Sequence, residues 1–170
     1  PTSATANWIA TNNPTPGEVN TASGSNNLIP GDLIMTEAMP NPWPSDDNAT
    51  WPGGEWVEIL NTGTGDIDLT GYSIEDAAGN VLPFNASHLV NASQTMLIAP
   101  GEHRIVAVNG TSNYGVLNNG VESLTLKWPN GSRSQEISWS STNAGFSLME
   151  STTPNAPWTY TPYPTPEGMN

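Results

Sequence analysis

The chain has 170 residues, with 16 glycines and 16 prolines, which suits one all-β domain with its own core plus a short extra segment. Sixteen acidic against three basic side chains give a formal net charge of −13, which argues against nucleic acid or an anionic membrane surface as a partner. Cysteine is absent, which excludes disulfides, thiolate zinc sites and cysteine nucleophiles.

The chain opens with residues 1–20, which carry Trp8 and Ile9 and then become rich in proline and asparagine. Residues 21–27 are small and polar, which predicts a flexible linker. A first strand is predicted at 32–38, and a loop rich in proline and tryptophan follows at 39–54.

The segment 55–61 is predicted to be a central strand, because it is aromatic and β-branched and lies between two glycine-rich turns. Alternation places Val57 and Ile59 on one face and Trp56 on the other, so both faces carry apolar side chains. The two glutamates of this strand, Glu55 and Glu58, would need hydrogen bonds or a position at the rim, since a buried carboxylate is costly.

The rest of the chain alternates short apolar runs with turns. Further strands are predicted at 67–69, 72–76, 81–84, 95–99, 104–108, 121–128, 135–139 and 146–149. Asn130-Gly131 predicts a hairpin turn, with both residues at its centre, and Ile137 and Trp139 should share one face of the return strand. Residues 150–170 form a proline-rich tail. Many short strands with regular turns predict a sandwich or a barrel.

Five separated motifs resemble the lamin tail domain family, over about residues 28–170. They are Ile34-Met35-Thr36-Glu37 with Asn41-Pro42; Gly54-Glu55-Trp56-Val57-Glu58-Ile59-Leu60-Asn61; Asp68-Leu69-Thr70-Gly71-Tyr72-Ser73-Ile74; Leu97-Ile98-Ala99-Pro100-Gly101-Glu102 with Val106; and Trp158 with Pro164-Thr165-Pro166 and Asn170. The last motif departs from the family, which tends to read Thr-Pro-Gly, because Glu167 precedes Gly168. The resemblance implies an immunoglobulin-like β-sandwich without a catalytic site, of the kind found as accessory modules of secreted and surface proteins in prokaryotes. A nuclear role does not carry over, because no coiled-coil rod is present.

Residues 1–20 are related to residues 151–170, which we name the closing segment. Eight of twenty positions agree at an offset of 150, against roughly one or two expected from composition. The matched positions are Thr2, Ala6, Trp8, Thr11, Pro14, Thr15, Pro16 and Asn20 with Thr152, Ala156, Trp158, Thr161, Pro164, Thr165, Pro166 and Asn170. Two similar linkers rich in threonine and proline would also give this pattern.

If the closing segment fills a groove of its own domain, residues 1–20 cannot sit there too. We therefore expect them to complete a neighbouring copy by strand addition, with Trp8, Ile9, Pro14 and Pro16 at the interface. Such contacts run head to tail and give filaments when they do not close. The expected partners are copies of the same chain, either as tandem repeats or as separate subunits of a surface fibre.

Catalysis has little support. His88 and His103 lie in separate segments without an adjacent acid or serine motif, so a triad is not indicated. Glu55 and Glu58 should lie on opposite faces of their strand, although Glu37 could face one of them if the two strands are neighbours. Hydrogen-bonded structural carboxylates are the stronger interpretation.

Calcium is a possible ligand, and no other cofactor is expected. The candidate ligands are Asp46, Asp47, Asp66 and Asp68, which lie in oxygen-rich stretches, as do Glu75 and Asp76. None of these stretches has the EF-hand spacing, and solvated loop acids are the ordinary alternative.

Glycans are expected as attachments or as ligands. Five Asn-x-Ser/Thr sequons in or beside predicted loops are candidate glycosylation sites: Asn48, Asn85, Asn91, Asn109 and Asn130. Trp43 and Trp51 share one loop and could stack on sugar rings, in which case the chain would be a carbohydrate- or calcium-dependent binding module of a secreted protein. Trp56, Trp128 and Trp139 are expected in the core.

The chain shows neither a secretory signal nor an apolar run of roughly 18 residues, so we expect no membrane insertion. A mature form, a fragment and a module of something longer all fit this sequence. The preferred interpretation is a non-enzymatic, extracellular structural module at the cell surface.

Overall fold

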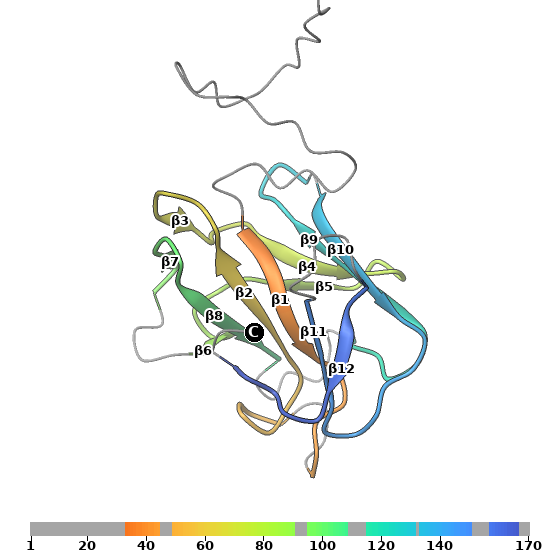
Figure 1. Cartoon of the computed structure of the whole chain (residues 1–170). Helices are drawn as coiled ribbons and strands as arrows, with labels where there is room; N and C mark the ends of the chain where they lie inside the picture. The colour runs from red at the N-terminus through yellow and green to blue at the C-terminus, as the bar shows by residue number, and fades with distance from the viewer. Residues whose placement is uncertain are drawn as a thin grey trace, which may run out of the picture.

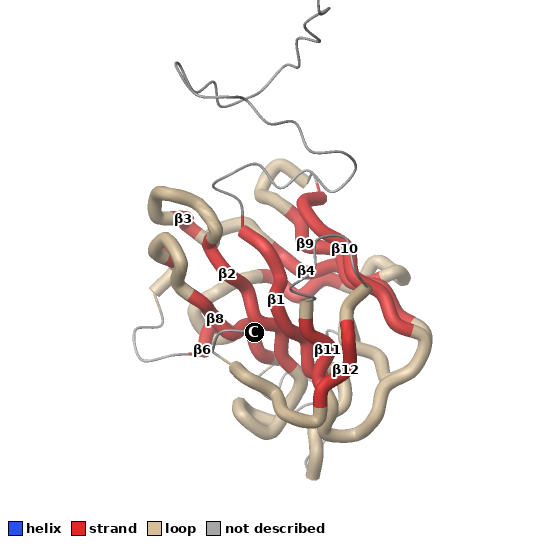
Figure 2. The backbone as a smooth tube through the Cα atoms, viewed as in Figure 1, coloured by secondary structure: helices blue, strands red, loops and turns tan. Residues whose placement is uncertain are grey.

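The structure is a computed structural model that describes residues 33–44, 49–90, 95–108, 115–131, 133–150 and 157–166. Every helix or strand within these ranges is a β-strand (Figures 1 and 2), which confirms the predicted all-β chain. The strands are β1 (Leu33–Met39), β2 (Trp56–Asn61), β3 (Ile67–Asp68), β4 (Ser73–Asp76), β5 (Val81–Pro83), β6 (Leu89–Val90), β7 (Leu97–Ile98), β8 (His103–Ala107), β9 (Glu122–Lys127), β10 (Arg133–Trp139), β11 (Ser147–Met149) and β12 (Thr159–Thr161). The same ranges contain no helix that is long and apolar enough to cross a membrane.

The strands form two main sheets that pack face to face. The larger sheet has the order β12-β11-β1-β2-β8-β6 and the smaller one β10-β9-β4-β5, while β3 and β7 form a separate pair. The main core lies between the two sheets, where side chains such as Ile59 from β2 meet Ile74 from β4 and Leu124 from β9. The predicted β-sandwich is therefore confirmed.

Strand β2 is an interior strand of the larger sheet, between β1 and β8. Val57 and Ile59 point into the main core. On the outer face of the same sheet, Trp56 packs with Ile105 and Ala107 in a second, smaller cluster. Burial of apolar side chains on both faces, which the alternation predicts, is confirmed, and each such side chain contributes about 1.5–3 kcal/mol.

A β-bulge interrupts β1, where the register with β2 shifts between Met35 and Glu37. Strand β11 pairs with β1 only at Glu37 and Ala38, so the backbone of Met35 needs other partners. Gln135 of β10 provides them: the Met35 N–H donates to Gln135 Oε1 (2.6 Å), and Gln135 Nε2 donates to the Met35 carbonyl (3.2 Å). One buried amide thus joins the smaller sheet to the bulge of the larger one.

Two strands were not predicted from the sequence. They are β6, which pairs with β8, and β12, which lies inside the tail that reads as proline-rich loop. The hairpin between β9 and β10 is confirmed, but its turn is centred one residue earlier than predicted. Gly131 N–H donates to the Trp128 carbonyl (2.8 Å), so Pro129 and Asn130 are the central residues, and Gly131 follows with φ of 81°.

Gly54, directly before Glu55 and β2, has no room for a side chain. A Cβ at this position would lie 2.0 Å from the backbone oxygen of Ala49. We expect Gly54→Ala to lower the free energy of unfolding by about 1–3 kcal/mol, because backbone must move to relieve the overlap. Denaturant unfolding of the two proteins measures the difference.

Gly65→Ala is the matched control, because a Cβ at Gly65 meets nothing within 4 Å. Its unfolding midpoint should stay near that of the parent chain. A Gly54→Ala variant as stable as the control would contradict the close packing of the loop against the start of β2.

Candidate functional site

Two buried carboxylates lie next to each other on the larger sheet. Glu37 of β1 and Glu58 of β2 are register partners in the antiparallel pair, and neither side chain is exposed to solvent. The bulge in β1 produces this pairing, because it shifts the register immediately before Glu37. Like charges placed directly opposite each other in low dielectric are unfavourable, so each carboxylate needs its own compensation.

The buried charge of Glu58 has polar neighbours in β1 and β8. The Thr36 hydroxyl donates to Glu58 Oε1 (2.6 Å), so the extra residue of the bulge serves the carboxylate of the neighbouring strand. His103 Nδ1 lies 3.0 Å from the same oxygen but is not aligned for a hydrogen bond. This second contact is an ion pair only when His103 is protonated.

The buried charge of Glu37 is compensated by donors from β11 and from residues 157–166. These residues are the last described part of the proline-rich segment 150–170, and from here on we call them the tail. The Ser147 hydroxyl donates to Glu37 Oε1. Thr165 N–H donates to the two carboxylate oxygens at 3.3 and 3.1 Å, and the Thr165 hydroxyl donates to Oε2 at 3.3 Å. We name Glu37 and Ser147 together the Glu37 site.

The tail first adds a strand to the larger sheet and then crosses its outer face. β12 pairs antiparallel with β11, and Trp158, just before it, packs against the main core. After β12 the chain turns back toward the other strands of the larger sheet (Figure 1), and Thr165 reaches Glu37 of β1. Ten residues at the end of the described chain thus extend the sheet beyond β11 and reach its outer face.

Burial raises the pKa of Glu37 above its ordinary value of 4.5, and the neighbouring charge of Glu58 acts in the same direction. The hydrogen bonds from Ser147 and Thr165 oppose this shift, because they favour the ionised carboxylate. The net shift is upward, so the desolvation of Glu37 outweighs the hydrogen bonds that it accepts.

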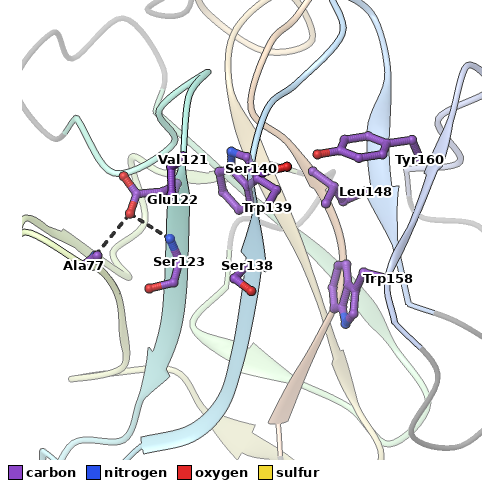
Figure 3. A pocket seen from close by; sticks show the side chains of 10 residues that line it. All are labelled: Ala77, Val121, Glu122, Ser123, Ser138, Trp139, Ser140, Leu148, Trp158 and Tyr160. Carbon is purple, nitrogen blue, oxygen red and sulfur yellow. Dashed lines mark hydrogen bonds between the residues drawn. The ribbon is translucent and has the colours of Figure 1, made fainter.

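The tail also forms one wall of a hollow between the open edges of the two sheets. The hollow has a volume of about 560 Å³. Figure 3 shows Glu122 and Ser123 of β9 on one side, Ser138 and Trp139 of β10 in the middle, and Trp158 and Tyr160 from the tail on the other side. Both Glu122 oxygens already accept bonds: Oε1 from the Ala77 and Ser123 N–H groups, and Oε2 from the Asn118 amide.

Comparison with known families identifies the fold. The lamin tail domain model matches residues 29–141, which is more than half of the chain. The chain belongs to the lamin tail domain family. No curated protein and no solved structure matches it. The family is an immunoglobulin-like structural and interaction module rather than a known enzyme family, which agrees with the sandwich described above.

Several predicted site residues of this lamin tail domain fall outside the described residues, and their assignments stay predictions. They are the interface residues Trp8, Ile9, Pro14 and Pro16, the acids Asp46 and Asp47, and the sequon residues Asn48, Asn91 and Asn109.

The other calcium candidates have local roles in loops. Asp66 and Asp68 are both exposed, and Asp68 Oδ1 accepts the Thr70 N–H (2.9 Å). Hydrogen bonds from the Thr70 hydroxyl and N–H lower the pKa of Asp68. Asp76 accepts the N–H groups of Ala78 and Asn80 (2.9 and 2.7 Å). In the described part of the chain, no three His, Asp or Glu side chains cluster closely enough to hold a metal ion.

The two described sequons differ in exposure. Asn130 is exposed in the hairpin turn. Asn85 is half-buried, and its side-chain oxygen accepts the Ser87 N–H (3.0 Å) and the Ser87 hydroxyl (2.5 Å). A glycan at Asn85 would have to share its side chain with this local turn, whereas Asn130 is the more exposed of the two.

The two tryptophans considered for sugar stacking have different surroundings. Trp43 is 74% exposed. Trp51 packs against the smaller apolar cluster and meets Trp56 edge to face, with ring centroids 5.6 Å apart. Trp56 and Trp139 are buried, as predicted, and Trp128 is half-buried. Trp51 therefore already covers the outer cluster, which leaves Trp43 as the open ring of the pair.

His88 lies inside the fold, since its side chain is buried and its Nδ1 lies 2.9 Å from the Pro83 carbonyl.

The sequence raised Glu37 with one glutamate of β2 as a possible facing pair, and β1 and β2 are indeed neighbours, with Glu37 opposite Glu58. It missed Thr36, Ser147 and Thr165 as the donors to these carboxylates. It also missed Gln135 as the partner of the Met35 backbone. The repeated Pro-Thr-Pro tripeptide was the one signal that could have singled out Thr165.

The raised pKa of Glu37 makes folding depend on pH. The folded chain holds this proton more tightly than the unfolded chain, so the stabilisation is complete below pH 4.5 and is lost as pH rises through the folded pKa. We expect the free energy of unfolding to fall over that interval and Glu37→Gln to flatten the decline. Denaturant unfolding at a series of pH values measures the slope.

Glu150 is the control for this measurement, because burial raises its pKa as well. Glu150→Gln should remove only its own share of the pH dependence, and the double variant should remove both shares. A slope that is the same with and without Glu37 would show that its carboxyl is not desolvated in the folded chain.

Proposed function

We propose that the chain is a non-catalytic structural module of an extracellular, cell-surface fibre, joined head to tail to other copies through residues 1–20. The observation that carries this proposal is the docking of the tail onto the larger sheet. Trp158, β12 and Thr165 each make a distinct contact there, and residues 1–20 repeat Trp158, Thr161 of β12 and Thr165 as Trp8, Thr11 and Thr15.

The larger sheet has one such docking position for each copy, and the tail fills it. β12 pairs with β11, and Thr165 sits on Glu37. Residues 1–20 therefore match a position that their own domain has already filled. A second copy supplies the same position, which makes the contact heterologous and able to propagate.

Tandem repeats and separate subunits use this position differently. In a tandem array, each domain has one closing segment. Residues 1–20 would then be the closing segment of the preceding domain. Between separate chains, residues 1–20 of one copy compete with the tail of another, so binding requires an exchange. Both forms rest on the same contact and predict the same dependence on residues 1–20.

An extracellular location is supported by the composition of the chain. It carries five sequons and only 11% charged residues. Glycans at exposed positions such as Asn130 would add solubility that these few charges do not provide. This part of the proposal is checked by mass spectrometry of the native protein.

Self-association of the full chain tests the proposed function. We expect the average mass to rise with concentration, and Trp8→Ala to reduce the association by at least tenfold, because Trp8 matches Trp158, which is half-buried against the main core. Sedimentation velocity over a concentration series measures the association constant.

Trp43→Ala is the matched control, since it removes a tryptophan that is 74% exposed and lies outside the repeated segment. It should associate like the parent chain. A full chain that stays monomeric to millimolar concentration, or that associates equally well with Trp8→Ala, would contradict the head-to-tail module.

A further inference from the structure

The contact between the tail and Glu37 depends on one short sequence, Pro164-Thr165-Pro166. Proline has no N–H group, so Thr165 supplies the only backbone donor of this tripeptide. Its N–H and hydroxyl both point to the Glu37 carboxylate, at 3.1 and 3.3 Å from Oε2. Pro166 also biases Thr165 toward an extended backbone, which limits the conformations that binding must fix.

The same tripeptide occurs at residues 14–16, at the same distance from the other anchors. Trp8, Thr11 and Thr15 have the spacing of Trp158, Thr161 and Thr165. In the tail these three positions pack on the core, pair with β11 and bind Glu37, respectively. A segment with this spacing can reach all three positions when it follows the path of the tail.

We propose that the Glu37 site is the receptor for Thr15 of a second copy, which donates its N–H and hydroxyl to the Glu37 carboxylate in place of Thr165. This inference rests on the proposed function and assigns its partner to particular atoms. The partner is a segment of an identical chain, recognised by a single threonine between two prolines. Ser147 stays in place during the exchange and holds Oε1 of Glu37 in position.

Residues 1–20 and the tail are not equivalent as ligands of the Glu37 site. Within one copy, the difference favours binding of the tail. Tyr160 donates its hydroxyl hydrogen to the Ser141 carbonyl, and Ala10 stands at the matching position of the first segment. The tail is also attached to its own domain, which gives it an effective concentration in the millimolar range. Exchange therefore needs a high local concentration of residues 1–20, as copies within a fibre or a tandem chain provide.

A labelled peptide of residues 1–20 added to the full-length chain tests this assignment, with fluorescence anisotropy as the readout. Thr165→Val in the chain weakens the competing tail, so it should tighten peptide binding by about tenfold. Thr15→Val in the peptide should weaken binding by a similar factor. The two changes act in opposite directions only if both threonines compete for one site.

A double-mutant cycle locates the contact. The loss caused by Thr15→Val should be large with the parent chain and should shrink to less than twofold with Glu37→Gln, because the charged acceptor is then missing. Thr11→Val in the peptide is the matched control, and its effect should be the same with both chains. Each value comes from the same anisotropy titration.

Two results would overturn the assignment. One is peptide binding that is unaffected by Thr165→Val, which would place the peptide elsewhere. The other is a Thr15→Val loss that is equal with the parent chain and with Glu37→Gln. Either result can occur while Trp8→Ala still abolishes self-association, in which case the head-to-tail module survives and only the Glu37 receptor is wrong.

Discussion

The desolvation of two neighbouring carboxylates is the constraint around which the outer face of this sandwich is organised. Glu37 and Glu58 are paired across β1 and β2, and both are fully buried. Buried carboxylates persist only when their oxygens are hydrogen-bonded. Glu58 finds its donor on the adjacent strand, in Thr36. Glu37 draws on residues more than a hundred positions away, which is why the tail must return to β1.

The bulge in β1 sets up this arrangement. By shifting the register after Met35, it brings Glu37 opposite Glu58 and Thr36 within reach of the Glu58 carboxylate. The same shift falls where the Met35 backbone has no partner in β11, and Gln135 of the smaller sheet supplies both a donor and an acceptor there. The register of β1 with β2, the pairing of the carboxylates and one hydrogen-bonded link between the sheets therefore meet at one local irregularity.

The lamin tail domain match ends at residue 141, yet the sheet that carries the buried pair is completed by β11, β12 and the tail. This later part of the chain provides Ser147 and Thr165, the donors to Glu37. It also provides Trp158 and Tyr160, which line the hollow between the sheet edges. The segment that completes this sheet is thus held by separate contacts at Trp158, β12 and Thr165.

The sequence by itself determined the all-β class, the interior position of β2 and the burial of both its faces, because these follow from alternation and turn chemistry over a few residues. The family came from the resemblance of five separated motifs, which the family model then confirmed. The sequence also showed the likeness of residues 1–20 to the closing segment. Only the tertiary structure decided that Glu37 faces Glu58, that Gln135 joins the bulge, and that the proline-rich tail contains a strand. The physical reason is that each of these depends on polar partners far apart along the chain, and a local pattern carries no record of which distant donor will satisfy a buried acceptor.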